Sequence, residues 1–283
     1  MRGQLFPSLA DAVKIGEKEE STLFGPSLCL YCFAGGKTKR DWSWLFGKQE
    51  GPALCEKCLN QLIRITGETC SLCSRPFAFT DCRYREGDRC LDCVRWENQR
   101  EWKGILSKNI SLYLYNDFLK EYLARFKYRG DYILARAFAG PMAKAAERLE
   151  FDLVVPIPLS ESRLLERGFN QAEALARFAG LHPRNVLGRS SSEKQDKKGR
   201  QERIRMGQVF YILESETVRG RTILLVDDIY TTGTTVRMAA GVLLEQGARR
   251  VYSLTVARGW ATGGSQMVTP GFHGKGSKFS ATN

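Results

Sequence analysis

Two adjacent carboxylates and a run of threonines follow an apolar segment of the sequence, and together they could hold a sugar phosphate. The apolar residues Ile223–Val226 precede the acid pair, and a Thr/Gly turn follows it. Backbone N–H groups and hydroxyls of such a turn can bind a phosphate, especially where a helix begins directly after it. The carboxylates can accept hydrogen bonds from vicinal ribose hydroxyls or lie near a bound Mg²⁺. The candidate ligand-binding residues are Asp227, Asp228, Thr231, Thr232, Gly233, Thr234 and Thr235. The alternative is an ordinary strand-to-helix turn with two solvated carboxylates.

Cysteine spacing predicts one or two structural zinc sites. Eight of the nine cysteines form four Cys-x-x-Cys pairs, and Cys82 is left over as a free thiol. One pair presents two thiolates to a metal, and two pairs complete a tetrahedral Zn²⁺ site. A sequential scheme joins the first pair to the second and the third to the fourth, whereas an interleaved scheme joins first to third and second to fourth. The shorter spacing of the last two pairs favours the sequential scheme. The candidate ligands are Cys29, Cys32, Cys55, Cys58, Cys70, Cys73, Cys90 and Cys93.

Two other uses of these cysteines are less favoured. Disulfides are typical of secreted proteins, and Met1–Glu20 contains no continuous apolar stretch that would form a signal peptide. Redox-active pairs require a βαβ context that this region does not show. Because an all-thiolate site leaves no open position for water, the predicted zinc stabilises a small fold and does not react.

The elements that position the acid pair are predicted to form an α/β domain. After Cys93, short apolar runs alternate with segments of helical periodicity, a pattern typical of a parallel sheet covered on both faces. The acid pair then lies at the carboxyl end of a strand, where open α/β sheets bind ligands. The predicted strands are Ile110–Tyr115, Leu153–Leu159, Gln208–Leu213, Thr222–Asp228 and Arg250–Ala257, and the predicted helices are Asp117–Tyr128, Tyr132–Leu149, Glu161–Phe178 and Val236–Glu245.

Length and composition are consistent with one full domain and a smaller one. The chain has 283 residues, of which 43% are hydrophobic, and its net charge of +12 favours anionic partners. We expect a flexible extension over 1–28, a zinc-binding module over 29–95, the α/β domain over 96–258, and a disordered Gly/Ser/Thr-rich tail over 259–283. The sequence contains no apolar run long enough to span a bilayer, which predicts a cytoplasmic protein without a transmembrane segment.

Several motifs resemble known families. Ile223–Thr235 resembles the phosphoribosyl pyrophosphate (PRPP) signature of type I phosphoribosyltransferases. The segments Val155–Leu159, Glu166–Gln171, Leu114–Asp117 and Leu123–Gly130, behind a region of cysteine pairs, are similar to the ComF family. The resemblance implies a type I phosphoribosyltransferase-like doubly wound parallel sheet, preceded by a small cysteine-rich zinc-binding module. It also implies a competence protein that handles single-stranded DNA during natural transformation and binds PRPP with Mg²⁺. The resemblance further implies partners such as a ComFA-like helicase. It also implies a cytoplasmic protein that these partners hold at the inner face of the membrane.

By the same resemblance, the segment after Pro158 faces the pyrophosphate of PRPP. Backbone N–H groups of Leu159, Ser160 and Glu161 are the expected donors, and Arg163 and Arg167 are the expected cations. The alternative for the two arginines is a solvated helix face. The chain departs from the pattern at Glu161, where related amidotransferase-type domains carry glycine. A carboxylate near pyrophosphate disfavours turnover more than it disfavours binding.

Basic residues mixed with aromatic ones are candidates for contact with single-stranded DNA, because rings stack on bases and cations follow phosphates. We expect Phe118 and Phe126 to pack on the sheet instead. The segment Ser190–Arg205 has three interpretations: a loop that closes over a reacting centre, a charged surface loop, or a DNA-backbone contact. The DNA candidates are Arg125, Lys127, Arg129, Lys194, Lys197, Lys198, Arg200 and Arg203.

Three functions fit these observations. The first is a DNA-uptake protein that binds DNA and a phosphoribosyl ligand. The second is an active phosphoribosyltransferase that transfers the phosphoribosyl group to a base or amine through an oxocarbenium-like state, with Mg²⁺ on the pyrophosphate. The third is a structural zinc adaptor. One scaffold hosts binders and catalysts alike, so the fold does not choose among them.

Overall fold

The computed structural model describes residues 28–35, 53–79, 84–128, 130–190 and 209–259. The chain divides into two compact units, Met1–Cys58 and Leu59–Asn283, and each is described by itself below. The expected extension up to residue 27 and the expected tail from residue 260 lie outside the described residues. So do the following residues named above: Cys82, Arg129, Lys194, Lys197, Lys198, Arg200 and Arg203.

The larger unit is built on a four-stranded parallel sheet. Its strands are β3 (Lys108–Leu114), β8 (Arg250–Arg258), β7 (Thr222–Tyr230) and β4 (Leu153–Pro156), in that spatial order. The central strand β7 carries four consecutive apolar residues, Ile223–Val226, that are fully buried. Such a run is typical of a parallel strand covered on both faces. The predicted doubly wound α/β fold is confirmed.

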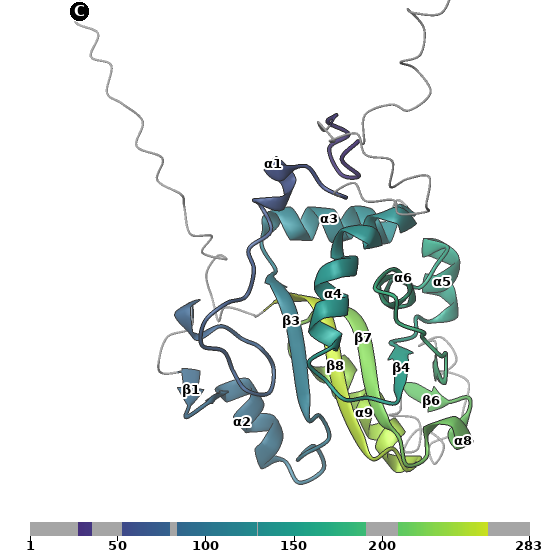
Figure 1. The fold of residues 1–283 in the computed structure, drawn as a ribbon. Helices are drawn as coiled ribbons and strands as arrows, with labels where there is room; N and C mark the ends of the chain where they lie inside the picture. The colour runs from purple at the N-terminus through teal and green to yellow at the C-terminus, as the bar shows by residue number, and fades with distance from the viewer. Residues whose placement is uncertain (1–27, 36–52, 80–83, 129, 191–208, 260–283) are drawn as a thin grey trace, which may run out of the picture. The chain divides into compact units, whose positions relative to one another are not determined.

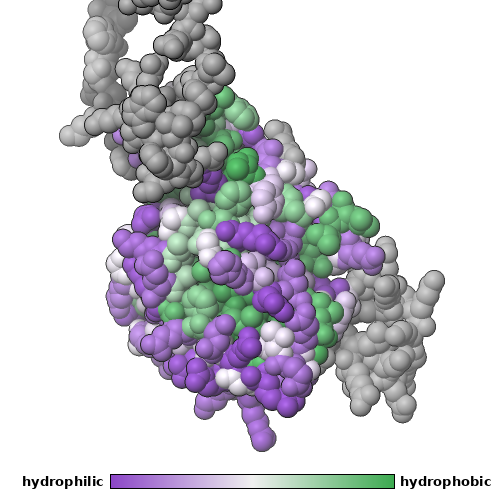
Figure 2. All heavy atoms as spheres, turned by 45° about the vertical axis from the view of Figure 1, so that its right-hand side comes forward, coloured by the Kyte–Doolittle hydropathy of each residue, from purple (hydrophilic) through white to green (hydrophobic). Residues whose placement is uncertain are grey.

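Helices cover both faces of this sheet. Figure 1 shows α4 (Ala139–Ala146) and α6 (Gln171–Phe178) across one face and α9 (Thr234–Glu245) on the other. Helix α3 (Asp117–Tyr128) has the bounds predicted from the sequence. Helix α5 (Glu161–Arg167) follows β4 and leads towards α6. The face that carries α5, α6 and β6 mixes small hydrophobic areas with hydrophilic side chains (Figure 2).

Two of the predicted helices differ in the structure. The helix predicted over Tyr132–Leu149 begins as a 3-10 helix, Tyr132–Phe138, before α4. The helix predicted over Glu161–Phe178 is interrupted at Gly168, whose φ of 76° is left-handed and ends α5. The Asn170 side chain then accepts hydrogen bonds from the N–H groups of Ala172 and Glu173, and so starts α6.

An antiparallel ribbon lies apart from the main sheet. It pairs β5 (Leu187–Arg189) with β6 (Phe210–Ile212), and the short helix α8 (Ser215–Val218) follows. The strand predicted over Gln208–Leu213 is therefore present, but it does not join the parallel sheet. Its partner β5 was not predicted, because three residues are too few for a periodic pattern.

The second pair of cysteine motifs belongs to the α/β unit. The hairpin of β1 (Arg85–Glu86) and β2 (Arg89–Cys90) and the helix α2 (Leu91–Asn98) carry Cys90 and Cys93. Cys70, Cys73, Cys90 and Cys93 are buried in the same core cluster as Val155 and Leu225. The boundary between the two compact units, after Cys58, falls within the residues 29–95 predicted as a zinc-binding module.

The smaller unit is described over 28–35 and 53–58. Leu28 and Gly35 form an isolated antiparallel bridge, and the Leu30 N–H donates to the carbonyl of Ala53 at 2.9 Å. The short helix α1 (Glu56–Leu59) crosses the boundary between the units. In the described parts of both units, no helix is long and apolar enough to cross a membrane.

Candidate functional site

The acid pair stands near the carboxyl end of the central strand β7. Asp228 is 8% exposed and Asp227 is half-buried. The Asp228 N–H donates to Oδ1 of Asp227 at 2.9 Å. Burial and the charge of Asp228 raise the pKa of Asp227, the Asp228 N–H and Lys127 oppose the shift, and the net value is about 8. Two carboxylates that close repel each other, so the site favours a ligand that brings hydrogen-bond donors or a cation.

A lysine pairs with the second acid. Lys127 of α3 forms an ion pair with Oδ2 of Asp228, and both side chains are largely buried, with 18% and 12% exposed. This pair also affects Tyr115, whose pKa is raised by burial and by Asp228 and lowered by Lys127. Lys127, predicted as a DNA contact, therefore lies at the acid pair.

The turn after the acid pair depends on one glycine. Gly233 has φ of 83°, a left-handed conformation, and immediately precedes α9. A Cβ at this position would lie 2.2 Å from the Tyr230 hydroxyl and 2.3 Å from Nη1 of Arg237. Both the backbone conformation and the space thus require glycine.

The threonines of the turn present hydroxyls to solvent. Thr231, Thr232 and Thr234 are exposed, and Thr235 is half-buried. The hydroxyls of Thr232 and Thr234 lie 2.9 Å apart. Helix α9 begins at Thr234, so its first backbone N–H groups lie at the same end as these hydroxyls. This arrangement can bind a phosphate.

Three arginines add positive charge beside the acid pair. Burial lowers the pKa of Arg189, and the nearby charges of Arg163 and Arg167 lower it further, while Asp227 opposes them. Arg163 is exposed, and Arg167 donates from Nη1 to Oε1 of Gln171 at 2.9 Å. Arg163 and Arg167 were candidates from the sequence; Arg189 was missed. Its only local signal is its place at the end of a short strand before the basic segment.

The expected pyrophosphate segment is held by its own neighbours. Ser160 is 8% exposed and precedes α5, with its hydroxyl 3.2 Å from that of Ser162. Leu159 is half-buried. Nδ2 of Asn170 donates to the carbonyl of Ile157 at 3.1 Å, which ties the start of α6 to the segment after β4.

The cysteines form two groups whose geometry fits zinc. The groups are Cys29, Cys32, Cys55 and Cys58 in one unit, and Cys70, Cys73, Cys90 and Cys93 in the other; within each, the sulfur atoms lie within 4.8 Å of one another. The cysteines are thus grouped as in the sequential scheme. A zinc ion with Zn–S bonds of about 2.3 Å places its sulfurs about 3.8 Å apart.

The distances between sulfur atoms of each group agree with this zinc geometry. Cys32 and Cys55 sulfurs are 3.6 Å apart, as are those of Cys73 and Cys90, and all eight thiols are free. Burial raises the pKa of Cys29, but N–H donors from Cys32, Cys55 and Tyr31 lower it to a net value of about 6, whereas burial and the neighbouring thiols raise the pKa of Cys58. Thiolates are the form that binds zinc. Bound zinc would cross-link segments distant in sequence.

The aromatic and basic side chains of α3 differ in their surroundings. Phe126 is fully buried against Phe169, with ring centroids 5.4 Å apart, as expected for a ring that packs in the core. Arg125 pairs with Asp131. Tyr128 is 62% exposed, and the Arg167 guanidinium lies 5.3 Å from its ring centroid.

Comparison with known proteins identifies the family. A family model described as "Phosphoribosyl transferase domain" matches residues 164–266, which contain the acid pair and the threonine turn. The competence protein ComFC of Bacillus subtilis (strain 168) is 37% identical over 235 residues, or 82% of this chain and 95% of that protein. This chain belongs to the ComFC family of competence proteins.

A second ComFC relative and a solved structure extend the comparison. The competence protein ComFC of Streptococcus pneumoniae (strain ATCC BAA-255 / R6) is 31% identical over 81% of this chain and 99% of that protein. A solved purine phosphoribosyltransferase from Pyrococcus horikoshii Ot3 is 14% identical over 57% of this chain and 96% of that one, with a TM-score of 0.29. The parallel sheet and the family model together give this ComFC-family chain a phosphoribosyltransferase-like domain.

Proposed function

We propose that this chain acts in DNA uptake, and that its phosphoribosyltransferase-like domain binds a phosphoribosyl ligand such as PRPP with Mg²⁺. The observation that carries the proposal is the convergence of Asp227 and Asp228 with the Gly233 turn at one end of the sheet. Ribose hydroxyls would donate to the acids, and the 5-phosphate would lie against the threonine turn. Zinc at the two cysteine groups would stabilise the structure and take no part in a reaction.

The arginines beside the acid pair support a diphosphate on the same ligand. Arg163, Arg167 and Arg189 lie close enough together to lower the pKa of Arg189, so a bound anion would relieve their mutual repulsion. An anion with one phosphate at the turn and a diphosphate at the arginines has the charge pattern of PRPP.

Calorimetric titration with PRPP, with and without Mg²⁺, tests this proposal. Changing Asp227→Asn together with Asp228→Asn removes the negative charge and replaces one acceptor oxygen of each carboxylate by an NH2 donor, and we expect at least about tenfold weaker binding. Asp152→Asn is the matched control, because Asp152 accepts from the Thr222 N–H at the opposite end of β7. Absence of PRPP binding at millimolar concentration would refute the proposal.

Pyrophosphate release, followed in the same samples with added bases and amines, separates a binding protein from a transferase. Binding without release supports a ligand-binding role. Release that requires both acids would establish turnover, the alternative predicted from the sequence.

We further propose that single-stranded DNA binds on the side of the molecule that carries α5. Exposed Tyr128 offers a ring for base stacking, and exposed Arg163 and half-buried Arg167 offer charge for the backbone. The net charge of +12 supports the same partner. A ComFA-like helicase and other competence proteins are the proposed protein partners, from the family alone.

A further inference from the structure

Two arginines are buried between the second cysteine group (Cys70, Cys73, Cys90 and Cys93) and the turn Thr231–Gly233, which is called the phosphate turn below. Arg237 is 0% exposed and Arg258 is 1% exposed. Burial of a guanidinium is strongly unfavourable unless its charge and its N–H groups find partners. The partners of these two arginines connect the cysteines to the turn.

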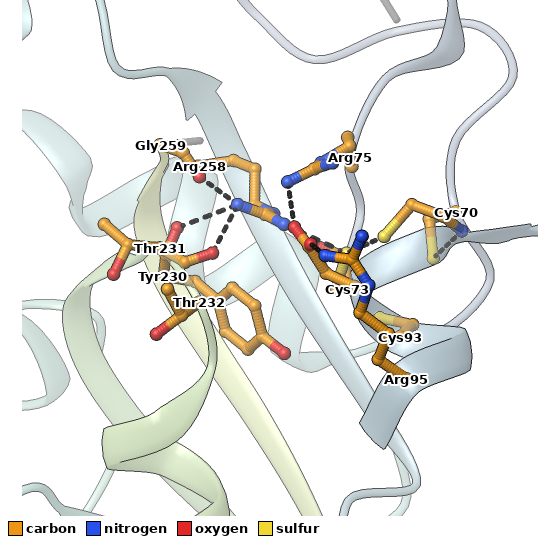
Figure 3. A network of polar contacts seen from close by, with 12 residues as sticks. Cys70, Cys73, Arg75, Cys93, Arg95, Tyr230, Thr231, Thr232, Arg258 and Gly259 are labelled. Carbon is orange, nitrogen blue, oxygen red and sulfur yellow. Dashed lines mark hydrogen bonds and ion pairs between the residues drawn. The ribbon is translucent and has the colours of Figure 1, made fainter. Parts of the chain in front are cut away.

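Arg258, at the end of β8, contacts both sides (Figure 3). On one side, Nε donates to the carbonyl of Cys73 at 3.0 Å and Nη2 donates to its sulfur at 3.2 Å. On the other side, Nη1 donates to the carbonyls of Thr231 at 2.8 Å and Tyr230 at 3.3 Å, and also to that of Gly259. One side chain thus fixes the backbone of the turn relative to a zinc-ligand candidate.

Arg237, in the second turn of α9, makes a similar connection. Its Nη1 donates to the Tyr230 hydroxyl at 2.5 Å, and its Nη2 lies 3.9 Å from the sulfur of Cys93. The guanidinium also lies 5.0 Å from the ring centroid of Trp96. Trp96 belongs to α2, the helix that contains Cys93, and its Nε1–H donates to the carbonyl of Thr232 at 2.9 Å.

Charge balance indicates what the cysteines contribute. Four thiolates around one Zn²⁺ carry a net charge of −2, and the two buried guanidinium groups supply +2. Loss of the metal would free the four thiols to move apart, so the sulfur atoms of Cys73 and Cys93 would no longer be held beside the two guanidinium groups. The arginines would then have to move or take up solvent, and the carbonyls of the turn that they hold would be released.

We propose that the group Cys70, Cys73, Cys90 and Cys93, with its zinc, holds the phosphate turn in the conformation that binds the ligand. Arg258, Arg237 and Trp96 are positioning residues that make the affinity of the turn for a phosphorylated ligand depend on the bound metal. The ligand itself rests on the function proposed above. Because linkage between binding free energies is reciprocal, a ligand that holds the turn must also raise the affinity of this group for its metal.

Alkylation of individual cysteines, read by mass spectrometry, tests the coupling in the whole protein. A zinc-selective chelator that leaves Mg²⁺ free competes with the protein for zinc, and only the metal-free fraction in this equilibrium reacts with the alkylating reagent. With PRPP and Mg²⁺ present, we expect Cys73 and Cys93 to be alkylated about fivefold more slowly. Cys32 and Cys55 of the other group provide the internal control, and their rates should not change. Equal rates for Cys73 with and without bound PRPP would overturn the proposal.

Variants distinguish the connection made by Arg258 from a general effect on folding. Arg258→Lys keeps the charge but cannot reach the sulfur and the turn carbonyls together, so the protection of Cys73 by PRPP should disappear. Arg75→Lys is the matched control, since Arg75 is a buried arginine of the same cysteine motif that pairs with Asp92. Retained protection in Arg258→Lys, or its loss in Arg75→Lys, would contradict the assignment.

A second pair of variants addresses the case in which Arg258→Lys does not fold. Trp96→Phe removes the bond to the Thr232 carbonyl and keeps an aromatic ring, and it should reduce the protection. Trp102→Phe changes the ring that packs on Trp96 at 5.2 Å and should leave the protection intact. Equal effects of the two substitutions would count against the proposal.

Hydrogen exchange of the ligand-free protein separates failure of this inference from failure of the proposed function. Removal of the metal should speed exchange of the amides of Thr231–Gly233 more than those of Val242–Leu244, farther along α9. This measurement needs no PRPP, so it decides the coupling even if PRPP does not bind. Unchanged exchange in the turn after metal removal would refute the inference.

Discussion

Asp227 is the residue whose protonation should control ligand binding. Burial and the neighbouring Asp228 raise its pKa to about 8, so at neutral pH most molecules without ligand carry a proton on this carboxyl group. A protonated carboxyl is a poorer acceptor for ribose hydroxyls and a poorer ligand for Mg²⁺. Folding shows a related dependence: an unfolded Asp ionises near pH 4, so this group lowers the free energy of unfolding as pH rises from about 4 to 8.

The affinity for PRPP should therefore increase between pH 7 and 8 and level off above about pH 8. The limiting slope is tenfold per pH unit, because one proton is released on binding. Calorimetry in buffers of different ionisation enthalpy measures that proton directly. Asp227→Asn should bind more weakly, without this pH dependence and without the proton release.

Lys127 provides an independent check that the titration of Asp227 causes the pH dependence. Its positive charge lowers the pKa of Asp227, so Lys127→Met should move the midpoint of the pH dependence upward. Lys120→Met, on the exposed side of the same helix, should leave the midpoint in place. A midpoint that does not respond to Lys127→Met would show that another group titrates.

At the scale of elements, the turn between β7 and α9 should tolerate no side chain at Gly233. Gly233→Ala introduces a left-handed alanine, which costs about 1–2 kcal/mol, and a Cβ that collides with Tyr230 and Arg237. We expect PRPP binding to be lost and the free energy of unfolding to fall by more than the cost of the backbone alone. Urea denaturation and calorimetric titration measure the two effects.

Gly220 supplies the matched control. Its φ is 71°, and a Cβ there would meet no atom within 4 Å. Gly220→Ala should therefore lower the free energy of unfolding only by the cost of the left-handed backbone conformation, and this variant should still bind PRPP. If both substitutions cost the same stability and leave binding unchanged, the close approach at Gly233 has no part in the site.

The same elements show which features sequence reasoning can reach. The bounds of α3 were predicted because its apolar residues recur at helical spacing, and the apolar run of β7 marked a strand buried on both faces. Gly168 carried a usable signal for the break between α5 and α6, which the periodicity of the surrounding residues concealed. The positions of Lys127 and Arg189 had no such signal. Each depends on a contact between segments far apart in sequence, and periodicity reports only which face of an element is apolar.

At the scale of the whole molecule, the two cysteine groups should differ in their effect on stability. The second group is part of the core of the α/β unit, whereas the first lies in the other unit. Native mass spectrometry should find two zinc ions, and Cys55→Ser or Cys73→Ser should each remove one. Cys73→Ser should lower the thermal midpoint of the α/β unit strongly, because it opens that core and leaves Arg258 without its sulfur partner. Cys55→Ser should leave that midpoint nearly unchanged, and equal losses would contradict the division.

The positive charge of the molecule should act on single-stranded DNA through a local surface. Each contact with a phosphate of single-stranded DNA contributes about 0.7 to the slope of log K against log salt concentration. Arg163→Ala with Arg167→Ala should therefore reduce the slope by up to about 1.4, measured by fluorescence anisotropy with labelled oligothymidylate over a salt series. Arg219→Ala with Arg221→Ala removes the same net charge from exposed positions before β7, at the opposite end of the sheet. This control should keep the wild-type slope. Equal reductions by both double variants would mean that DNA responds to net charge alone, and the proposed surface beside α5 would have to be abandoned.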